Sequence, residues 1–145
     1  MKTNSKIYSL IYEHTENQQL KKQIERHVCD DEWNILDEFE NINKEDLNSF
    51  DQKVRDAFLC RVSSLSFKYK IVKPLLNNIL DILRDLESHD HKIALKGFIY
   101  HNYAIVLGYM GKAKTKQYQT YLNEAEKIYN NLDAEYDLMF LELHK

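Results

Sequence analysis

Glycine, proline and cysteine are all scarce in this chain of 145 residues. Three glycines and one proline punctuate the whole sequence, whereas a sheet protein with many tight turns normally uses more of both. The scarcity therefore predicts helices rather than strands. The two cysteines, Cys29 and Cys60, come without a secretory signal, which predicts reduced thiols rather than a structural disulfide.

Long apolar runs are also missing. The sequence has no stretch of about 18 apolar residues, the length that a membrane-spanning helix requires. Its first residues turn polar too soon for a secretory signal, so we expect a cytoplasmic protein. With 43% apolar and 30% charged residues, the composition is typical of a globular chain, and the length fits one domain covering residues 1–145.

Apolar residues recur every three or four positions along most of the chain, which is the pattern of amphipathic helices. Thr15 and Gln18 fit a capping box before the second helix, and Asn43 fits an N-cap before the fourth. The run from Ile93 to Met110 is apolar around most of its circumference, which predicts a central helix, and Gly111 fits a left-handed C-cap after it. We expect an all-α domain of seven or eight helices in stacked antiparallel hairpins. The predicted helices cover about residues 7–14, 20–28, 33–39, 47–65, 74–86, 93–110, 118–129 and 134–144.

The stretch from Leu95 to Leu132 resembles a tetratricopeptide-type helix pair, with about two extra residues in the turn. That repeat has characteristic positions for small residues, for an aromatic residue or leucine, and for glycine. In this chain they can be occupied by Asn102, Ala104, Leu107, Gly111, Leu122 and Ala125. The resemblance implies a groove that binds protein or peptide, without catalysis. An irregular helical bundle is the alternative interpretation of the same residues.

A second resemblance concerns Arg84 to His89, "RDLESH", which is similar to the signature of the HEPN ribonucleases. Those are small all-α proteins that usually dimerise and cut RNA without a metal. The resemblance implies that His89 transfers a proton and that Arg84 holds the scissile phosphate. The preferred interpretation is a solvated helix end, because residues five apart lie about 140° apart on a helix and Asp85, Glu87 and Asp90 surround the pair.

Metal and cofactor sites find little support in the sequence. His89, Asp90 and His91 could serve as ligands with His101 as a further one, but no Cys or His pair elsewhere has the spacing of a zinc site. No glycine-rich phosphate loop is present. We therefore predict no resident metal and no cofactor.

Acidic residues are concentrated between Asp30 and Asp51, where nine acids face one base, Lys44. The net charge of this segment is −8. Because the net charge of the whole chain is −3, the remainder of the chain has a net charge of +5. Such a segment repels a phosphate backbone and suits a basic partner. We expect a non-enzymatic protein-binding module, most concretely a small inhibitor of the immunity-protein or antitoxin type that covers a basic nuclease toxin, with a HEPN-type RNase as the alternative. Neither a membrane nor, outside that alternative, a nucleic acid is an expected partner. The expected partner-binding residues are Asp30, Asp31, Glu32, Trp33, Asp37, Glu38 and Glu40.

Overall fold

The computed structural model describes residues 1–65, 74 and 89–145, and this part of the chain contains seven α-helices, one 3-10 helix and no strand. The prediction of an all-α domain is therefore confirmed, while the helix predicted over 74–86 lies almost entirely outside the described residues. The elements are α1 (Lys6–His14), α2 (Gln18–Cys29), α3 (Leu36–Glu40), η1 (Lys44–Asp46), α4 (Ser49–Leu65), α6 (Asp90–Tyr109), α7 (Lys116–Asn131) and α8 (Glu135–Glu142).

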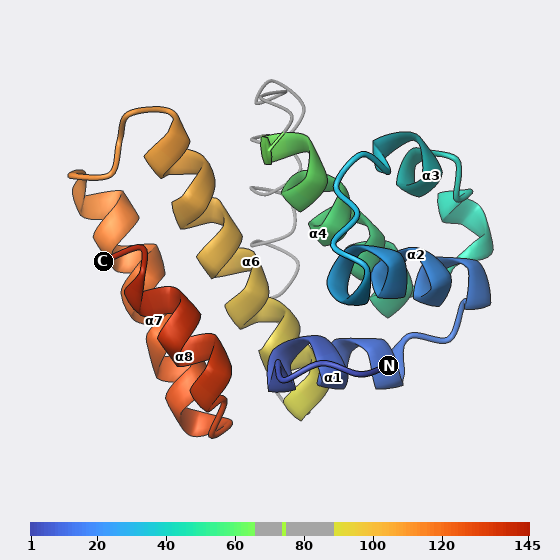
Figure 1. Cartoon of the computed structure of the whole chain (residues 1–145), viewed down its shortest axis with the longest axis horizontal. Helices are drawn as coiled ribbons and strands as arrows, with labels where there is room; N and C mark the ends of the chain where they lie inside the picture. Colours follow the sequence, from blue (N-terminus) through green and yellow to red (C-terminus); the bar gives the residue numbers. More distant parts are fainter. Residues whose placement is uncertain (66–73, 75–88) are drawn as a thin grey trace.

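The described helices form two groups (Figure 1). Helices α2, α3 and α4 pack on one another on one side, and α6, α7 and α8 do so on the other. Helix α1 joins the groups, because it contacts α2 as well as α6 and α8, and α4 also contacts α6. The N-terminal helix thus lies beside the C-terminal one, although they are at opposite ends of the sequence.

One hydrophobic core runs through both groups. Phe58 on α4 is completely buried, and its ring centroid lies 5.9 Å from that of Phe39 and 4.9 Å from that of Phe98. Helix α6 buries eleven of its 20 residues, which confirms the central helix predicted between Ile93 and Met110. The tetratricopeptide-like character of α6 and α7 stays a prediction.

Some helix ends differ from those that the local sequence patterns predict. The capping box at Thr15 is wrong, because Thr15 ends α1 and its hydroxyl donates to the Ile11 carbonyl, 2.7 Å away. Asn17 caps α2 instead by accepting from the Leu20 amide. The buried carboxylate of Asp51, from α4, accepts from the Glu16 and Asn17 amides and fixes this start.

The structure also tests three further predicted helix ends. Asn43 does act as a cap, but it caps η1, and α4 begins six residues later at Ser49. The prediction that Trp33 lies in the third helix is wrong, because α3 begins only at Leu36. Gly111 has φ +76° directly after α6, so its predicted left-handed conformation is confirmed.

Helices α6 and α7 pack closely at Gly97, where there is no room for a larger residue. A Cβ there would lie 2.8 Å from Ile128 Cγ2 and 3.0 Å from Tyr129 Cε1. Gly97→Ala should therefore lower the free energy of unfolding by about 1–2 kcal/mol, because crowding outweighs the better helix propensity of alanine.

Gly108 on the same helix provides the matched control. A Cβ at Gly108 would meet the Tyr118 ring at 3.4 Å, an ordinary contact, so Gly108→Ala should be neutral or stabilise by up to about 1 kcal/mol. Urea unfolding followed by circular dichroism measures both. Equal effects of the two substitutions would contradict the close approach at Gly97.

Candidate functional site

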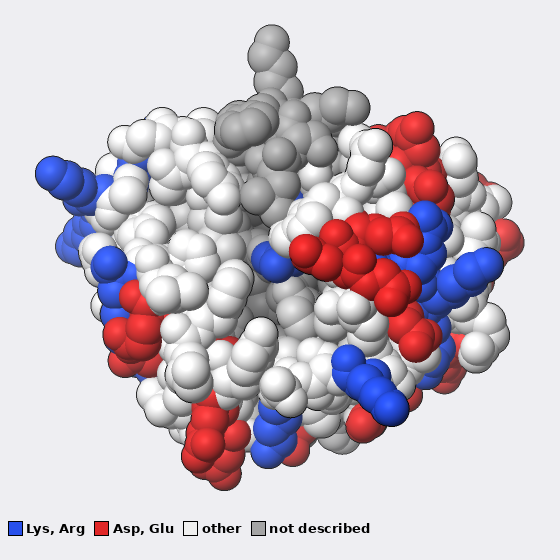
Figure 2. Space-filling view, viewed as in Figure 1, with Lys and Arg blue, Asp and Glu red and all other residues white. Residues whose placement is uncertain are grey.

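A groove lies between the two groups of helices and opens on the face shown in Figure 2. It consists of a pocket of about 230 Å³ and an adjoining hollow of about 400 Å³. Both share Trp33, Arg61, Asn102 and Phe140 as lining residues, so we treat them as one central groove. Other lining residues include Thr3, Tyr8, His27, Asp31, Phe98, His101, Ile105, Tyr109, Tyr129, Tyr136, Asp137 and His144.

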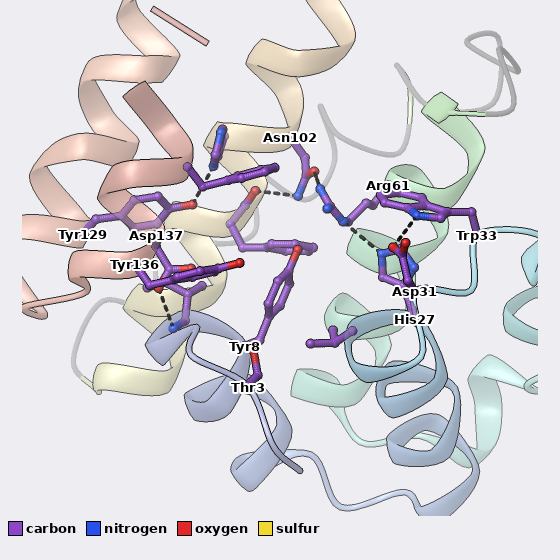
Figure 3. A pocket seen from close by; sticks show the side chains of 15 residues that line it. Thr3, Tyr8, His27, Asp31, Trp33, Arg61, Asn102, Tyr129, Tyr136 and Asp137 are labelled. Carbon is purple, nitrogen blue, oxygen red and sulfur yellow. Dashed lines mark hydrogen bonds between the residues drawn. The ribbon is translucent and has the colours of Figure 1, made fainter. Parts of the chain in front are cut away.

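Arg61 reaches from α4 into the wall of the groove (Figure 3). Its Nε donates to His27 Nε2 at 3.0 Å, and one terminal nitrogen donates to Asn102 Oδ1 at 3.0 Å. The guanidinium also lies over the Trp33 ring, 4.9 Å from its centroid, a distance suited to a cation–π contact. One side chain thereby joins α4 to α2 and α6.

His27 is held neutral by its two partners. Its Nδ1 lies 2.8 Å from the Glu32 carbonyl oxygen, which can only accept, so Nδ1 carries the proton and Nε2 accepts from Arg61. Burial, followed by the nearby charge of Arg61, lowers the pKa of His27 to about 4. With both ring nitrogens occupied, His27 positions Arg61 and the 30–35 loop rather than transferring protons at neutral pH.

His101 occupies a similar position on the α6 side. Its Nδ1 lies 3.1 Å from the Tyr129 hydroxyl and its Nε2 lies 3.1 Å from His144 Nδ1. Burial, with His144 as the second cause, lowers the pKa of His101 to about 3. The Tyr118 hydroxyl donates to the His144 carbonyl, so these contacts fix the C-terminal residues against α6 and α7.

Asp137 lines the pocket together with Tyr8 and Tyr136 (Figure 3). Its carboxylate accepts from the Ser5 hydroxyl at 2.6 Å and from the Ile7 amide at 3.3 Å, which caps α1 from α8. Burial raises the pKa of Asp137. This carboxylate therefore holds the first and last helices together.

Of the six predicted acids, Asp31 lines the groove, and the other five lie within nine residues of Asp31 in the sequence. Asp31 and Trp33 line the groove, and the Trp33 indole donates to Asp31 Oδ1 at 2.9 Å. Arg26 pairs with Glu32 at 2.6 Å and approaches Glu38 at 3.9 Å, so part of the charge is neutralised within the chain. We call these six acids the acidic rim: Asp30, Asp31, Glu32, Asp37, Glu38 and Glu40.

The predicted RNase and metal residues do not lie in the groove together. His89 is the exposed N-cap of α6, and its ring stacks on His91, which stacks on His14 with centroids 4.0 Å apart. Arg84 lies outside the described residues, so its pairing with His89 stays a prediction. His101 lies ten residues beyond His91 on α6, about 15 Å at 1.5 Å per residue, so the proposed three-histidine set is wrong. Among the described residues, no three metal-ligating side chains are grouped.

Sequence reasoning missed the centre of the groove. Arg61 gives no signal in the sequence, since it is one charged residue within a long amphipathic helix, and His27 is a single histidine within the second helix. Asn102 matches a position of the tetratricopeptide repeat in the sequence, yet in the structure it accepts from Arg61 and donates to the Phe98 carbonyl.

The helices and the whole sequence were also compared with membrane-spanning segments and with known proteins. Within the described part of the chain, no helix combines the length and apolarity needed to cross a bilayer. Neither a scan against protein-family models nor searches of curated proteins and of solved structures find a match for this chain.

Proposed function

We propose that this chain is a non-enzymatic protein-binding domain that holds a basic partner at the acidic rim and the central groove. The observation that carries the proposal is that Asp31 belongs to both, and that its hydrogen-bond partner Trp33 also lines the groove, so an exposed acid borders a concave, aromatic surface. Acidic residues around a recess attract a basic protein and speed its association. Aromatic side chains in a recess are typical anchors for a partner.

The groove's own chemistry supports binding rather than catalysis. His27 and His101 have both ring nitrogens engaged within the chain, and the Asp137 carboxylate accepts from α1. A general acid or base needs a nitrogen or oxygen that reaches the substrate. These groups instead hold the walls of the groove in place, which suits a preorganised binding surface.

The most concrete form of the proposal is a small inhibitor that covers the basic cleft of a nuclease toxin. A nuclease cleft gathers positive potential because it binds phosphates, and the acidic rim offers the opposite sign. The RNase alternative stays a prediction, since no contact among the described residues favours it.

Charge reversal of the rim is the direct test. Asp30, Asp37 and Glu40 are exposed, so Asp30→Lys, Asp37→Lys and Glu40→Lys together should leave the core intact. We expect the triple variant to lose a basic protein that the tagged wild-type chain captures from native lysate. With that protein purified, biolayer interferometry should show an association rate lower by about 10-fold to 100-fold.

Glu45 and Asp46 provide the matched control, because they are exposed acids of the same segment that lie in η1, outside the acidic rim. Glu45→Lys with Asp46→Lys should retain most of the association rate. Equal binding by wild type and the rim variant would overturn the proposal.

A further inference from the structure

Helix α8 exposes an apolar stripe to solvent. Tyr136, Met139, Phe140 and Leu143 are 49%, 70%, 39% and 77% exposed, and their spacing of three, four and seven residues places them on one side of the helix. The other side of α8 buries Asp137 and Leu141. We call the four exposed residues the α8 stripe. A contiguous exposed apolar patch of this kind marks an interaction surface.

The α8 stripe continues into the central groove. Tyr136 and Phe140 line the pocket, and Phe140 also lines the adjoining hollow together with Tyr109, which is itself half exposed. Figure 2 shows a largely uncharged surface over α6 and α8, and acids on the other side of the hollow. One face of the molecule thus presents an apolar wall and an acidic wall, separated by the groove.

Charge argues against a second copy of the chain as the occupant. In an antiparallel pairing of two α8 helices, Glu135 of one copy would approach Glu142 of the other, and such like-charge neighbours are destabilising. Lys145, the nearest base, already pairs with Glu142 and Glu126. A basic partner complements both the acids of α8 and the acidic rim.

Building on the proposed function, we propose that the partner element at this site is an amphipathic helix with a basic side. Its apolar side would lie along the α8 stripe and in the groove, and its lysine or arginine side chains would reach the acidic rim. The stripe spans seven residues, about 10 Å at 1.5 Å per residue. It therefore accepts anchors at positions i, i+3 or i+4, and i+7 of the bound helix.

Two model peptides test the helix separately from the charge. One is a labelled leucine–lysine peptide of about 18 residues patterned as an amphipathic helix, and the other has the same composition in an order without an apolar side. By fluorescence anisotropy, the wild-type chain should bind the patterned peptide at least about tenfold more tightly, which corresponds to about 1.4 kcal/mol. Met139→Ser with Leu143→Ser should remove this preference, because it deletes the two most exposed anchors.

Met110 offers the matched control, since it is an exposed apolar residue that lines neither part of the groove. Met110→Ser should keep the preference for the patterned peptide. If the Met139→Ser, Leu143→Ser variant also keeps it, the inference about the helix is overturned while the acidic rim can still bind a partner.

The charge reversal at Asp30, Asp37 and Glu40 further distinguishes the amphipathic-helix inference from the proposed function. It should weaken the binding of both peptides alike, and binding unchanged by the reversal would overturn the proposed function. Light scattering after size exclusion should show a monomeric wild-type chain. A dimer that Leu143→Ser dissociates would show the stripe covered by a second copy and would overturn the amphipathic-helix inference.

Discussion

Lowering the pH from 7 to 5 is expected to reduce the free energy of unfolding by about 2 kcal/mol for each of His27 and His101. Burial lowers the pKa of His27 to about 4 and that of His101 to about 3, from an ordinary value of 6.5. Between these values and 6.5 the unfolded chain binds protons that the folded chain excludes. The stability contributed by the neutral imidazoles is therefore complete above pH 6.5 and is lost as the pH falls.

Other titratable groups also change the stability of the fold with pH. Burial also lowers the pKa values of His91 and His144, which adds to the loss in the same direction. Burial raises the pKa of Asp137, so its protonation favours the folded state at low pH and opposes the loss. Because Asp137 is a single opposing carboxyl and four histidines have lowered pKa values, the net change between pH 7 and 5 is a loss of stability.

Urea unfolding at pH 7, 6 and 5 measures this dependence, and single variants divide it between sites. His27→Asn and His101→Asn should each be less stable than wild type at pH 7, because each breaks a buried contact. Each should also lose less stability on going to pH 5 than the wild type loses. A variant with the wild-type pH dependence would contradict the assignment for that histidine.

Local sequence patterns predicted the elements of this fold that depend on neighbours in the chain. The span of α6 follows from an apolar run near Ile93–Met110, and the conformation of Gly111 follows from its place after that run. Predictions failed where a distant residue intervenes. The capping role assigned to Thr15 is displaced because Asp51, 35 residues from Glu16, fixes the start of α2.

The central groove could not be predicted for the same reason. Arg61 meets His27 across 34 residues and Asn102 across 41, while Asp137 meets Ser5 across 132. Helical periodicity shows which side of a helix turns inward, but it does not show which other helix that side meets. The acidic segment is visible from composition, whereas the position of Asp31 and Trp33 at an aromatic groove depends on the packing of α2 and α6 against α4.

Phe58→Ala is expected to be the most destabilising single substitution considered, with a loss of about 3–5 kcal/mol in the free energy of unfolding. Phe58 is completely buried where the two groups of helices meet. Its ring lies 5.9 Å from Tyr8, 4.9 Å from Phe98 and 6.1 Å from His27, measured between centroids. Alanine would leave a cavity among aromatic rings that cannot close without moving α1, α2 or α6.

Two variants make this measurement interpretable in urea unfolding. Phe58→Leu keeps most of the volume and should cost less than about 1.5 kcal/mol, whereas Leu143→Ala changes an exposed residue and should stay within about 0.5 kcal/mol. A loss below about 1 kcal/mol for Phe58→Ala would show that the core relaxes around the cavity. Because Tyr8, His27 and Phe98 contact Phe58 and also line the groove, such relaxation would change the groove's shape. The core residue that stabilises the fold is thus also in contact with three residues that line the central groove.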